Sequence, residues 1–518
     1  MLDQHRGIEC DLLVIGGGIN GAGIARDAAG RGLSVVLCER DDLARHTSSA
    51  STKLIHGGLR YLEHYEFGLV RKALREREVL LRVAPHIISP LRFVLPRLPG
   101  GRPAWMIRAG LFLYDRLAKR ELLPASATLR LDRHEAGAAL KGDATQAFAY
   151  SDAWVDDARL VVLNALDAKE RGATILTGTG CAEAVPEGAG WRARLEGRHA
   201  CTVRAKVVVN AAGPWAGQVA QMGEAGQARR SVRLVKGSHI VVPRLFSHQQ
   251  AYLFQHADGR VVFAIPYQGD FTLIGTTDLA YAGDPAAVAI DDGEVAYLCN
   301  LANQCFRKQV SRKDVVWSYS GVRPLLDDGT DNPSAVTRDY LLEWAPGTAP
   351  MLHVWGGKIT TYRKLAEHAL EMVAARLGTP AAGWTETAFL PGGDIAASVA
   401  DISPASFDAF SASFRALHPW LPADLARRYA RSYGTRAVRF LTGAASLCDL
   451  GGLVAPGLYE RELRYLVDVE WASCADDVLW RRTKQGLRCG PDDQIRLERW
   501  IDAYRAQLLA PSQGAAAG

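Results

Sequence analysis

The start of the chain shows an apolar run, a glycine turn, a helical segment and a second apolar run. Residues 12–15 predict a buried strand, and the segment after the turn predicts a helix that ends at about Arg31. Gly32 stops this helix, and residues 33–38 predict the next strand. The pattern indicates a βαβ unit, which is the building block of a parallel sheet.

The same α/β character returns later in the chain. Asp156 or Asp157 is expected to cap a helix that runs to Arg171, where Gly172 ends it. Further strands of this class are expected at 174–177, 193–195, 206–210 and 351–355, the last leading into a helix over about 361–377. These distant segments together predict one α/β domain.

Between about His239 and Tyr319 the pattern changes to short β-rich runs, which are typical of an antiparallel sheet. The expected strands are 239–242, 261–265, 271–275 and 315–319. A passage rich in Pro, Gly and Ser at about 391–407 predicts a linker, and helical patterning continues from it through Trp500. Residues 510–518 are expected to form a loose tail.

With 518 residues the chain is too long for a single hydrophobic core and can bury a large cofactor. We predict a discontinuous α/β domain, an inserted and mainly antiparallel β domain for the substrate, and a C-terminal α-helical domain. Their expected limits are 1–90, 150–235 and 336–392 for the first domain, 91–149 and 236–335 for the second, and 408–510 for the third.

Charge and cysteine content exclude some classes of partner. The 61 Lys and Arg against 56 Asp and Glu leave only +5, far from the concentrated positive charge of nucleic-acid-binding proteins. The nine cysteines are scattered singly, with no Cys/His cluster at metal-ligand spacing. Their odd number argues against a complete disulfide framework, so we expect a reducing compartment, no bound metal and no nucleic acid.

A glycine motif follows the first predicted strand and opens the first predicted helix. Gly16 is expected to make the tight turn, Gly18 to let the backbone approach a pyrophosphate, and Gly21 to let helix and strand pack closely. Glu39, at the end of the next strand, can accept hydrogen bonds from a ribose diol. With strand, helix and acid all in place, the motif predicts a dinucleotide site rather than a turn without a ligand.

The motif alone does not decide between FAD and NAD. The hydroxyl-rich, glycine-ended stretch 47–58 favours FAD, because it can supply several donors to the phosphates beneath a flavin. A polar surface loop is the alternative meaning of such a cluster. Small residues after another predicted strand, 210–213, suggest a turn that closes over the cofactor.

Several segments resemble one known family, the aerobic, FAD-dependent glycerol-3-phosphate dehydrogenases. The resemblance covers nearly the whole chain, with its motifs in the same order. The segments are DLLVIGGGINGAGIA (11–25), TSSASTKLIHGGLRYLE (47–63), YSDAWVDDARL (150–160), KGSHIVVP (236–243), GTTD (275–278), YSGVRPL (319–325), TRDY (337–340), GGKITTYRKL (356–365) and WRRTKQG (480–486).

The resemblance implies a fold like that of the D-amino-acid oxidase group, a non-covalent FAD and a homodimer. It also implies peripheral attachment to the cytoplasmic face of the cell membrane, with ubiquinone or menaquinone as acceptor. The implied substrate-site residues are Arg60, Tyr61, His239, Thr276, Arg323, Arg338 and Lys358. The implied cofactor residues are Gly16, Gly18, Gly21, Glu39, Thr47, Ser48, Ser49, Lys53, Leu54, His56, Gly213, Gly356, Gly357, Lys358 and Thr360.

Oxidation of sn-glycerol 3-phosphate at C2 to dihydroxyacetone phosphate requires cations for the phosphate, a base for the hydroxyl proton and stabilisation of the reduced flavin. Arginine guanidinium groups can hold phosphate oxygens in a bidentate fork. The base is His239, or else water or another group takes the proton while Arg323 or Lys358 holds the alkoxide. Gly356 and Gly357 precede a helix start that can face the negative charge of reduced flavin.

Residues 92–120 are expected to face a membrane. They combine one acid, Asp115, with seven basic residues and interleaved apolar ones, a composition that suits an anionic lipid surface. A solvated basic face over a buried helix is the alternative. Residues 1–10 do not form a signal peptide and no apolar stretch reaches spanning length, so we expect the protein to lie on the membrane.

Two other functions are compatible with these residues. An oxidase of the same fold would use oxygen in place of quinone, and release of peroxide would identify it. A flavin-containing scaffold without activity would keep the cofactor but ignore the substrate. The polar residues present at every expected position of the site argue against the scaffold.

Overall fold

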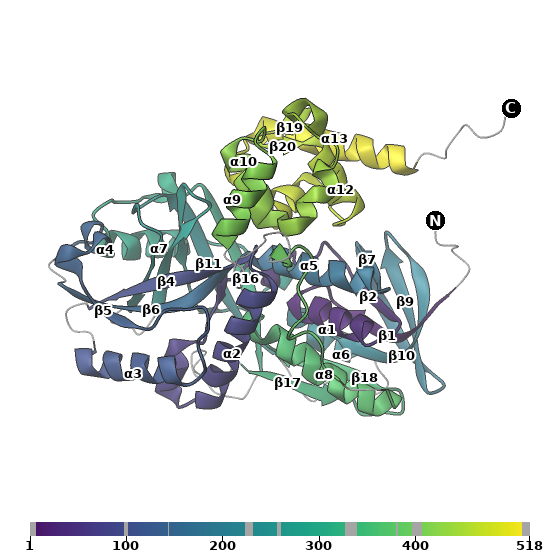
Figure 1. The fold of residues 1–518 in the computed structure, drawn as a ribbon. Coiled ribbons are helices and arrows are strands. Elements are labelled where there is room, and N and C mark those ends of the chain that lie inside the picture. The colour runs from purple at the N-terminus through teal and green to yellow at the C-terminus, as the bar shows by residue number, and fades with distance from the viewer. Residues whose placement is uncertain are drawn as a thin grey trace. The chain divides into compact units, whose positions relative to one another are not determined.

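A computed structural model of the chain describes residues 7–97, 102–142, 145–222, 232–255, 261–326, 339–379, 382–395 and 407–509, without the side chains of Arg60, His64 and Leu509. The chain divides into two units, Met1–Leu390 and Pro391–Gly518. The first contains two large sheets and the second is mainly helical (Figure 1).

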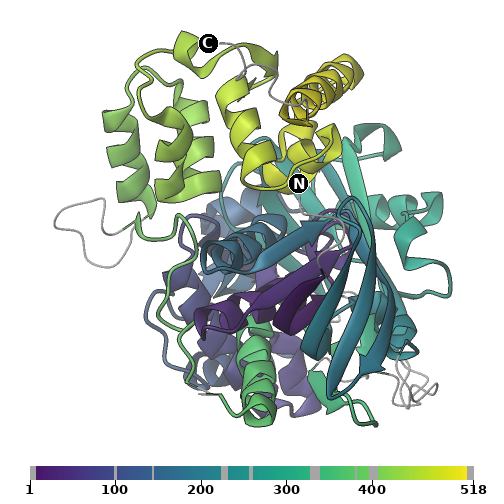
Figure 2. The same cartoon turned by 90° about the vertical axis from the view of Figure 1, so that its right-hand side faces the viewer.

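The first sheet is built on the βαβ unit that the sequence predicts. Its strands lie in the order β17 (Tyr340–Trp344), β18 (Met351–Gly356), β10 (Cys201–Asn210), β1 (Ile8–Ile15), β2 (Val35–Glu39) and β7 (Thr174–Thr177). All these pairs are parallel except β17 with β18. Figure 2 shows the purple strand β1 beside blue strands from far along the chain, among them β10.

Helices and a hairpin complete this α/β domain. α1 (Ile19–Gly30) packs against both α5 (Asp157–Glu170) and α8 (Tyr362–Leu377). The hairpin of β8 (Thr179–Glu187) and β9 (Gly190–Gly197) shares one apolar core with Leu13 and Ile15 of β1. The predicted cap of α5 is confirmed, because the Asp156 side chain accepts a hydrogen bond from the Arg159 amide.

The second sheet is mainly antiparallel, as predicted. Its strands lie in the order β15 (Leu279–Ala280), β11 (Val232–Pro243), β14 (Phe271–Gly275), β13 (Val261–Tyr267), β12 (Ala251–Gln255), β4 (Ile88–Pro96), β6 (Gln146–Val155) and β3 (Leu54–Ile55), with β16 (Trp317–Leu326) on β11 and β5 (Ala127–Arg130) on β6. Within the described part of this second sheet, β4 with β12 is the one parallel pair. α7 (Asp292–Cys305) packs on this second sheet, and the helix and the sheet share one apolar core.

Two predicted domain limits differ from this sheet. β4 and β6 pair from Ile88 opposite Val155, so both strands cross the limits expected at 90 and 150. β3 adds Leu54 and Ile55 from within the segment assigned to the α/β domain. Pairing between strands about sixty residues apart cannot be predicted from local periodicity. This explains why the predicted domain limits differ from the sheet.

The expected membrane-facing stretch, 92–120, is a strand followed by a helix. Phe93 on β4 is fully buried and Arg92 donates to the Ala125 carbonyl, so this part does not face outward as expected. α3 (Ala104–Arg116) does present apolar groups, because Trp105 is 70% and Phe112 is 59% exposed. The interpretation as a membrane surface is therefore restricted to α3.

Among the described residues, the remaining α-helices of the first unit are α2 (Phe67–Val83), α4 (Glu135–Ala138) and α6 (Ala216–Ala220). The second unit contains α9 (Phe407–Leu417), α10 (Ala423–Tyr433), α11 (Val438–Leu441), α12 (Glu460–Asp468) and α13 (Pro491–Leu509), with a small hairpin of β19 (Leu453–Ala455) and β20 (Leu458–Tyr459). Buried Tyr429, Tyr433 and Leu463 belong to its core, which confirms the predicted helical domain. Within the described ranges, no helix is both long and apolar enough to cross a bilayer.

Candidate active site

A cavity of about 430 Å³ lies in the first unit, where elements of both sheets meet. Its walls come from the turn between β1 and α1, the segment after β2, and the ends of β10 and β18 on the α/β side. Residues of β11, β13 and β16 complete it from the second sheet. The cavity therefore lies beyond the carboxyl ends of parallel strands, where α/β sheets bind ligands.

Most of the predicted site residues are brought together here. The predicted residues in the lining are Gly16, Gly18, Glu39, Thr47, Ser48, Leu54, His56, Tyr61, Gly213, Thr276, Arg323, Gly356, Gly357 and Lys358. Predicted residues behind the lining are Gly21, Ser49, Lys53, His239 and Thr360. Arg338 lies outside the described residues, and the side chain of Arg60 is not described.

The glycine turn has the geometry that the sequence predicts. Gly16 adopts φ +113°, in a region of backbone space that side chains rarely allow. A Cβ on Gly21 would lie 1.9 Å from the Gly16 carbonyl oxygen, so only glycine lets α1 approach the turn this closely. The predicted tight turn at Gly16 and close packing at Gly21 are both confirmed.

Glu39 lies against this turn in the wall of the cavity. Its carboxylate accepts hydrogen bonds from the backbone amides of Gly17, at 2.7 Å, and Asp41, at 2.8 Å. Burial raises the pKa of this carboxyl, while the two amide donors lower it. A carboxylate held in this way keeps its position at the lining and has lone pairs left for a sugar diol.

Lys53 is not placed as predicted. Its ammonium group is fully buried and donates to both oxygens of Asp157, at 2.8 and 2.9 Å, and to the Ser49 carbonyl. It therefore fastens the hydroxyl-rich segment to the first turn of α5 and does not point at a cofactor phosphate. Thr360 likewise acts behind the wall, where its hydroxyl accepts from the His56 amide at 3.3 Å.

The candidate substrate residues gather around Arg323 on β16. Its guanidinium group donates to Asp278 at 2.8 Å and to the Thr276 hydroxyl at 3.3 Å. A Cβ on Gly237 would lie 2.5 Å from this guanidinium, so the absence of a side chain there makes room for it. The Lys358 ammonium lies 4.7 Å from the centre of the Tyr61 ring, within range of a cation–π interaction.

His239 lies directly behind this group. Its Nε2 is 3.0 Å from the Thr52 hydroxyl, and its ring stacks on Tyr319 with centroids 4.8 Å apart. Burial and the charges of Arg323 and Lys53 hold its pKa well below the usual range, so the ring is neutral at neutral pH. A neutral imidazole can accept a proton, but its contact with the cavity runs through Thr52, which lines it.

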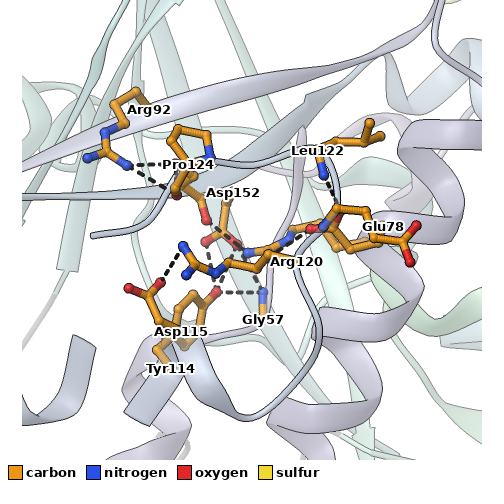
Figure 3. Close-up of polar contacts among 12 residues, drawn as sticks. Gly57, Glu78, Arg92, Tyr114, Asp115, Arg120, Leu122, Pro124 and Asp152 are labelled. Atoms are coloured by element: carbon orange, nitrogen blue, oxygen red, sulfur yellow. Dashed lines mark hydrogen bonds and ion pairs between the residues drawn. The ribbon is translucent and has the colours of Figure 1, made fainter. Parts of the chain in front are cut away.

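A buried network holds Gly57, the residue after His56 (Figure 3). The Tyr114 hydroxyl of α3 accepts from the Gly57 amide at 2.9 Å and donates to the Asp152 carboxylate at 2.8 Å. Arg77 neutralises Asp152 through an ion pair of 2.7 Å. A Cβ on Gly57 would lie 2.6 Å from the Tyr114 oxygen, so glycine is needed for this contact.

Comparison with known proteins identifies the family. The model of the FAD dependent oxidoreductase family matches residues 11–363, which include every described element of the cavity wall. The chain belongs to the FAD-dependent oxidoreductases. Within this family, it is 51% identical to the aerobic glycerol-3-phosphate dehydrogenase of Escherichia coli over 506 residues, which cover 96% of this chain and 99% of that protein.

Two further relatives bear on this oxidoreductase. The D-erythritol 1-phosphate dehydrogenase of Brucella abortus is also 51% identical, over 97% of this chain and 99% of that protein. The crystal structure of the glycerol-3-phosphate dehydrogenase from Bacillus halodurans complexed with FAD matches with a TM-score of 0.73 and 26% identity, covering 99% of this chain and 97% of that one. The predicted fold of the D-amino-acid oxidase type is thereby confirmed.

The cavity of this oxidoreductase fits FAD. α1 begins beside the lining with Gly18 at its N-cap, and that residue places no side chain over the helix end. The amides and dipole of this helix end suit a pyrophosphate, and Glu39 suits the ribose. Gly356 and Gly357, both with positive φ, bring backbone without side chains to the lining near the first turn of α1.

Sequence reasoning missed several lining residues. Asn20 donates from its amide to the Gly356 carbonyl at 3.2 Å and so ties the first turn to the turn after β18. It occupies a variable position of the glycine motif, which hides it. Arg40 lies 3.9 Å above the Trp215 ring, and His46 meets the same ring edge-on. Arg40 and His46 lie in the segment that follows Glu39, and this position could have predicted a contact with the nucleotide.

The buried network that holds Gly57 yields a stability prediction. Replacing Asp152 by Asn leaves Arg77 without its main buried counter-charge, and we expect a loss of about 3 kcal/mol in the free energy of unfolding. Tyr114→Phe removes hydrogen bonds only and should cost about 1–3 kcal/mol. Urea unfolding of the FAD-loaded protein measures both. Asp132→Asn, at an exposed pair with Arg130, is the matched control and should change little.

The depressed pKa of His239 predicts a pH effect on stability. In the unfolded chain this histidine gains a proton below pH 6.5, whereas the folded site keeps it neutral, so stability falls as pH drops below 6.5. Between pH 7 and pH 5.5 this difference is worth about 1 kcal/mol. In urea unfolding, we expect the free energy of unfolding of His239→Gln to fall by about 1 kcal/mol less than that of the wild type over this pH range. An identical pH dependence in both proteins would contradict the assignment.

Proposed function

We propose that this FAD-dependent oxidoreductase oxidises sn-glycerol 3-phosphate to dihydroxyacetone phosphate and passes the electrons to a membrane quinone, ubiquinone or menaquinone. The observation that carries the proposal is the pair of cations, Arg323 and Lys358, in the wall of one cavity with the glycine turns of the cofactor motif. The names of the relatives from Escherichia coli and Bacillus halodurans support the same substrate.

In this proposal each part of the wall has one task. Arg323 holds the substrate phosphate together with the Thr276 hydroxyl, which it already contacts. Lys358 stabilises negative charge as the C2 hydroxyl loses its proton. His239, which is neutral and lies behind Thr52, accepts that proton through the Thr52 hydroxyl. Bound FAD supplies the hydride acceptor at N5.

Anaerobic titration of the purified holoprotein tests this function. Adding sn-glycerol 3-phosphate without air should bleach the flavin absorbance in one equivalent of substrate. Dihydroxyacetone phosphate should appear in the same amount. A flavin that stays yellow with this substrate would refute the proposal, and one that also stays yellow with other polyol phosphates would favour the scaffold.

Another phosphorylated polyol is the second candidate substrate. The Brucella abortus relative, named for D-erythritol 1-phosphate, is as similar to this chain as the Escherichia coli relative is. Both substrates present a phosphate and hydroxyl groups, so the same cations suit both. Comparing kcat/KM for the two compounds decides between them. Quinone reduction against peroxide release likewise separates the dehydrogenase from an oxidase.

We further propose that α3 attaches a homodimer of this protein to the anionic inner face of the cell membrane. Trp105, Met106 and Phe112 are exposed apolar side chains on this helix, and Arg108 and Arg116 are exposed cations beside them. Exposed aromatic and basic groups on one helix suit the headgroup region of an anionic bilayer. The described residues of α3 include one acid, Asp115, which bonds to Ser126.

Flotation with anionic liposomes tests this attachment. Trp105→Asp combined with Phe112→Asp should reduce the liposome-bound fraction by at least about tenfold. Each change removes apolar area that the bilayer would bury and adds a negative charge that anionic lipid repels. Leu453→Asp, at an exposed apolar residue of the other unit, is the control and should float like the wild type. Undiminished flotation of the double variant would contradict the assignment of α3.

A further inference from the structure

A cluster of polar side chains lies behind the substrate side of the cavity, outside the proposed catalytic group. Its centre is Glu294 on the first turn of α7, with 5% of its surface exposed. One carboxylate oxygen accepts from the Ser238 hydroxyl at 2.8 Å and from the Thr277 hydroxyl at 2.7 Å. The other oxygen lies 2.6 Å from the Lys236 ammonium. No sequence motif marks this residue.

The partners of Glu294 alternate with residues of the proposed site. Successive side chains of a strand point to opposite faces, so Lys236 and Ser238 face α7 while Gly237 and His239 lie on the other face of β11. In the segment after β14 the same alternation holds: Thr277 bonds to Glu294, and Thr276 lines the cavity. Each anchored residue is therefore the immediate neighbour of a site residue.

The two anchored segments are also joined to each other. The Thr277 hydroxyl accepts from the Ser238 amide at 2.9 Å, and the Thr277 amide donates to the Ser238 carbonyl at 3.3 Å. Glu294 closes this contact by bonding to both side chains. The position of Arg323 depends on these two segments, because its guanidinium passes beside Gly237 and donates to Thr276 and Asp278.

We propose that Glu294 is a positioning residue for substrate binding: it fixes Thr276 and the space beside Gly237 so that Arg323 can hold the phosphate of the substrate. The inference rests on the proposed function, in which that phosphate lies at Arg323. Glu294 does not line the cavity and touches no reacting atom. Its effect passes through the backbone of two segments, and a shift of either one misplaces hydrogen-bond partners of the phosphate.

The test uses the FAD-loaded protein and two independent variants. Glu294→Gln keeps an acceptor for the hydroxyls but loses the charge that pairs with Lys236. Thr277→Val keeps the shape of the side chain but loses the two hydrogen bonds of the hydroxyl, and Thr277→Ser should restore them. Asp292→Asn, on the same helix turn but exposed and paired with Arg312, is the matched control.

Two quantities are measured: the Kd of inorganic phosphate from the change in flavin absorbance, and KM and kcat for sn-glycerol 3-phosphate. In Glu294→Gln and Thr277→Val we expect both Kd and KM to rise at least about fivefold, since a lost buried partner has an effect of this order. FAD content should stay at the wild-type value, and kcat should change less than KM. Thr277→Ser and Asp292→Asn should lie within about twofold of the wild type.

The proposal is overturned if both variants fold, retain FAD and keep Kd and KM within twofold of the wild type. It is also overturned if Thr277→Ser is as impaired as Thr277→Val, because the hydroxyl would then not be the cause. If Glu294→Gln does not fold, the two Thr277 variants decide alone. A wild-type protein that does not bind phosphate overturns the proposal, whereas one that binds phosphate but is not bleached by the polyol phosphate refutes the proposed function only.

Discussion

Replacing Arg323 by Met should lower kcat/KM for sn-glycerol 3-phosphate by roughly 30-fold to several thousand-fold. The guanidinium already donates to Asp278 and Thr276 on the cavity wall, so it is held in place before the substrate arrives. Removing one partner of a hydrogen-bonded charge pair costs about 2–5 kcal/mol, which gives this range. Steady-state kinetics of the holoprotein measure the effect, and FAD content should not change.

Arg323→Lys separates charge from geometry. It keeps one positive charge but loses the planar fork, so we expect an activity between those of the wild type and Arg323→Met. Because Arg323→Met also leaves Asp278 without its ion pair, the double variant with Asp278→Asn controls for stability. Compared with Arg323→Met, the double variant should be more stable but should show no higher activity. If kcat/KM of Arg323→Met lies within threefold of the wild-type value, Arg323 does not bind the substrate phosphate.

Local patterns predicted the parts of the fold that depend on local interactions. The strand, turn and helix around Gly16 and the cap at Asp156 were predicted because periodicity, glycine conformation and capping act over a few residues. The β4–β6 ladder crossed two predicted limits, because pairing between distant strands is selected by the whole sheet. The strand β4, which includes residues 92–96 of the expected membrane-facing stretch, was missed because its buried residues do not alternate with exposed ones.

The candidate site follows the same division. Glycines and Glu39 were found through a motif with fixed spacing, and most line the cavity. Lys53 was predicted as a cofactor residue from its segment alone, because its partner Asp157, which holds its ammonium group as a buried anchor, lies 104 positions away. Glu294 was missed for the same reason, since its partners lie on β11 and after β14. The roles of Arg60 and Arg338 stay predictions from the resemblance.

The second large effect is expected from a single methyl group at Gly21. In Gly21→Ala the new Cβ would lie 1.9 Å from the Gly16 carbonyl oxygen, so α1 must move away from the turn that it packs against. Forcing a methyl group into such a contact costs about 1–3 kcal/mol. The same movement displaces the helix end from the pyrophosphate. We expect the affinity for FAD to fall by roughly 5- to 150-fold, measured by flavin absorbance of the purified protein and by titration with FAD.

A second glycine distinguishes this clash from a general effect of alanine on a helix. Gly68 lies in α2, and a Cβ added to it would meet no described heavy atom within 4 Å. Gly68→Ala should therefore keep full FAD and gain slightly in stability, because alanine restricts the unfolded chain more than glycine does. Gly21→Ala should lose FAD while its far-UV circular dichroism stays close to that of the wild type. A yellow Gly21→Ala protein with unchanged affinity would mean that the distance between α1 and the turn does not control cofactor binding.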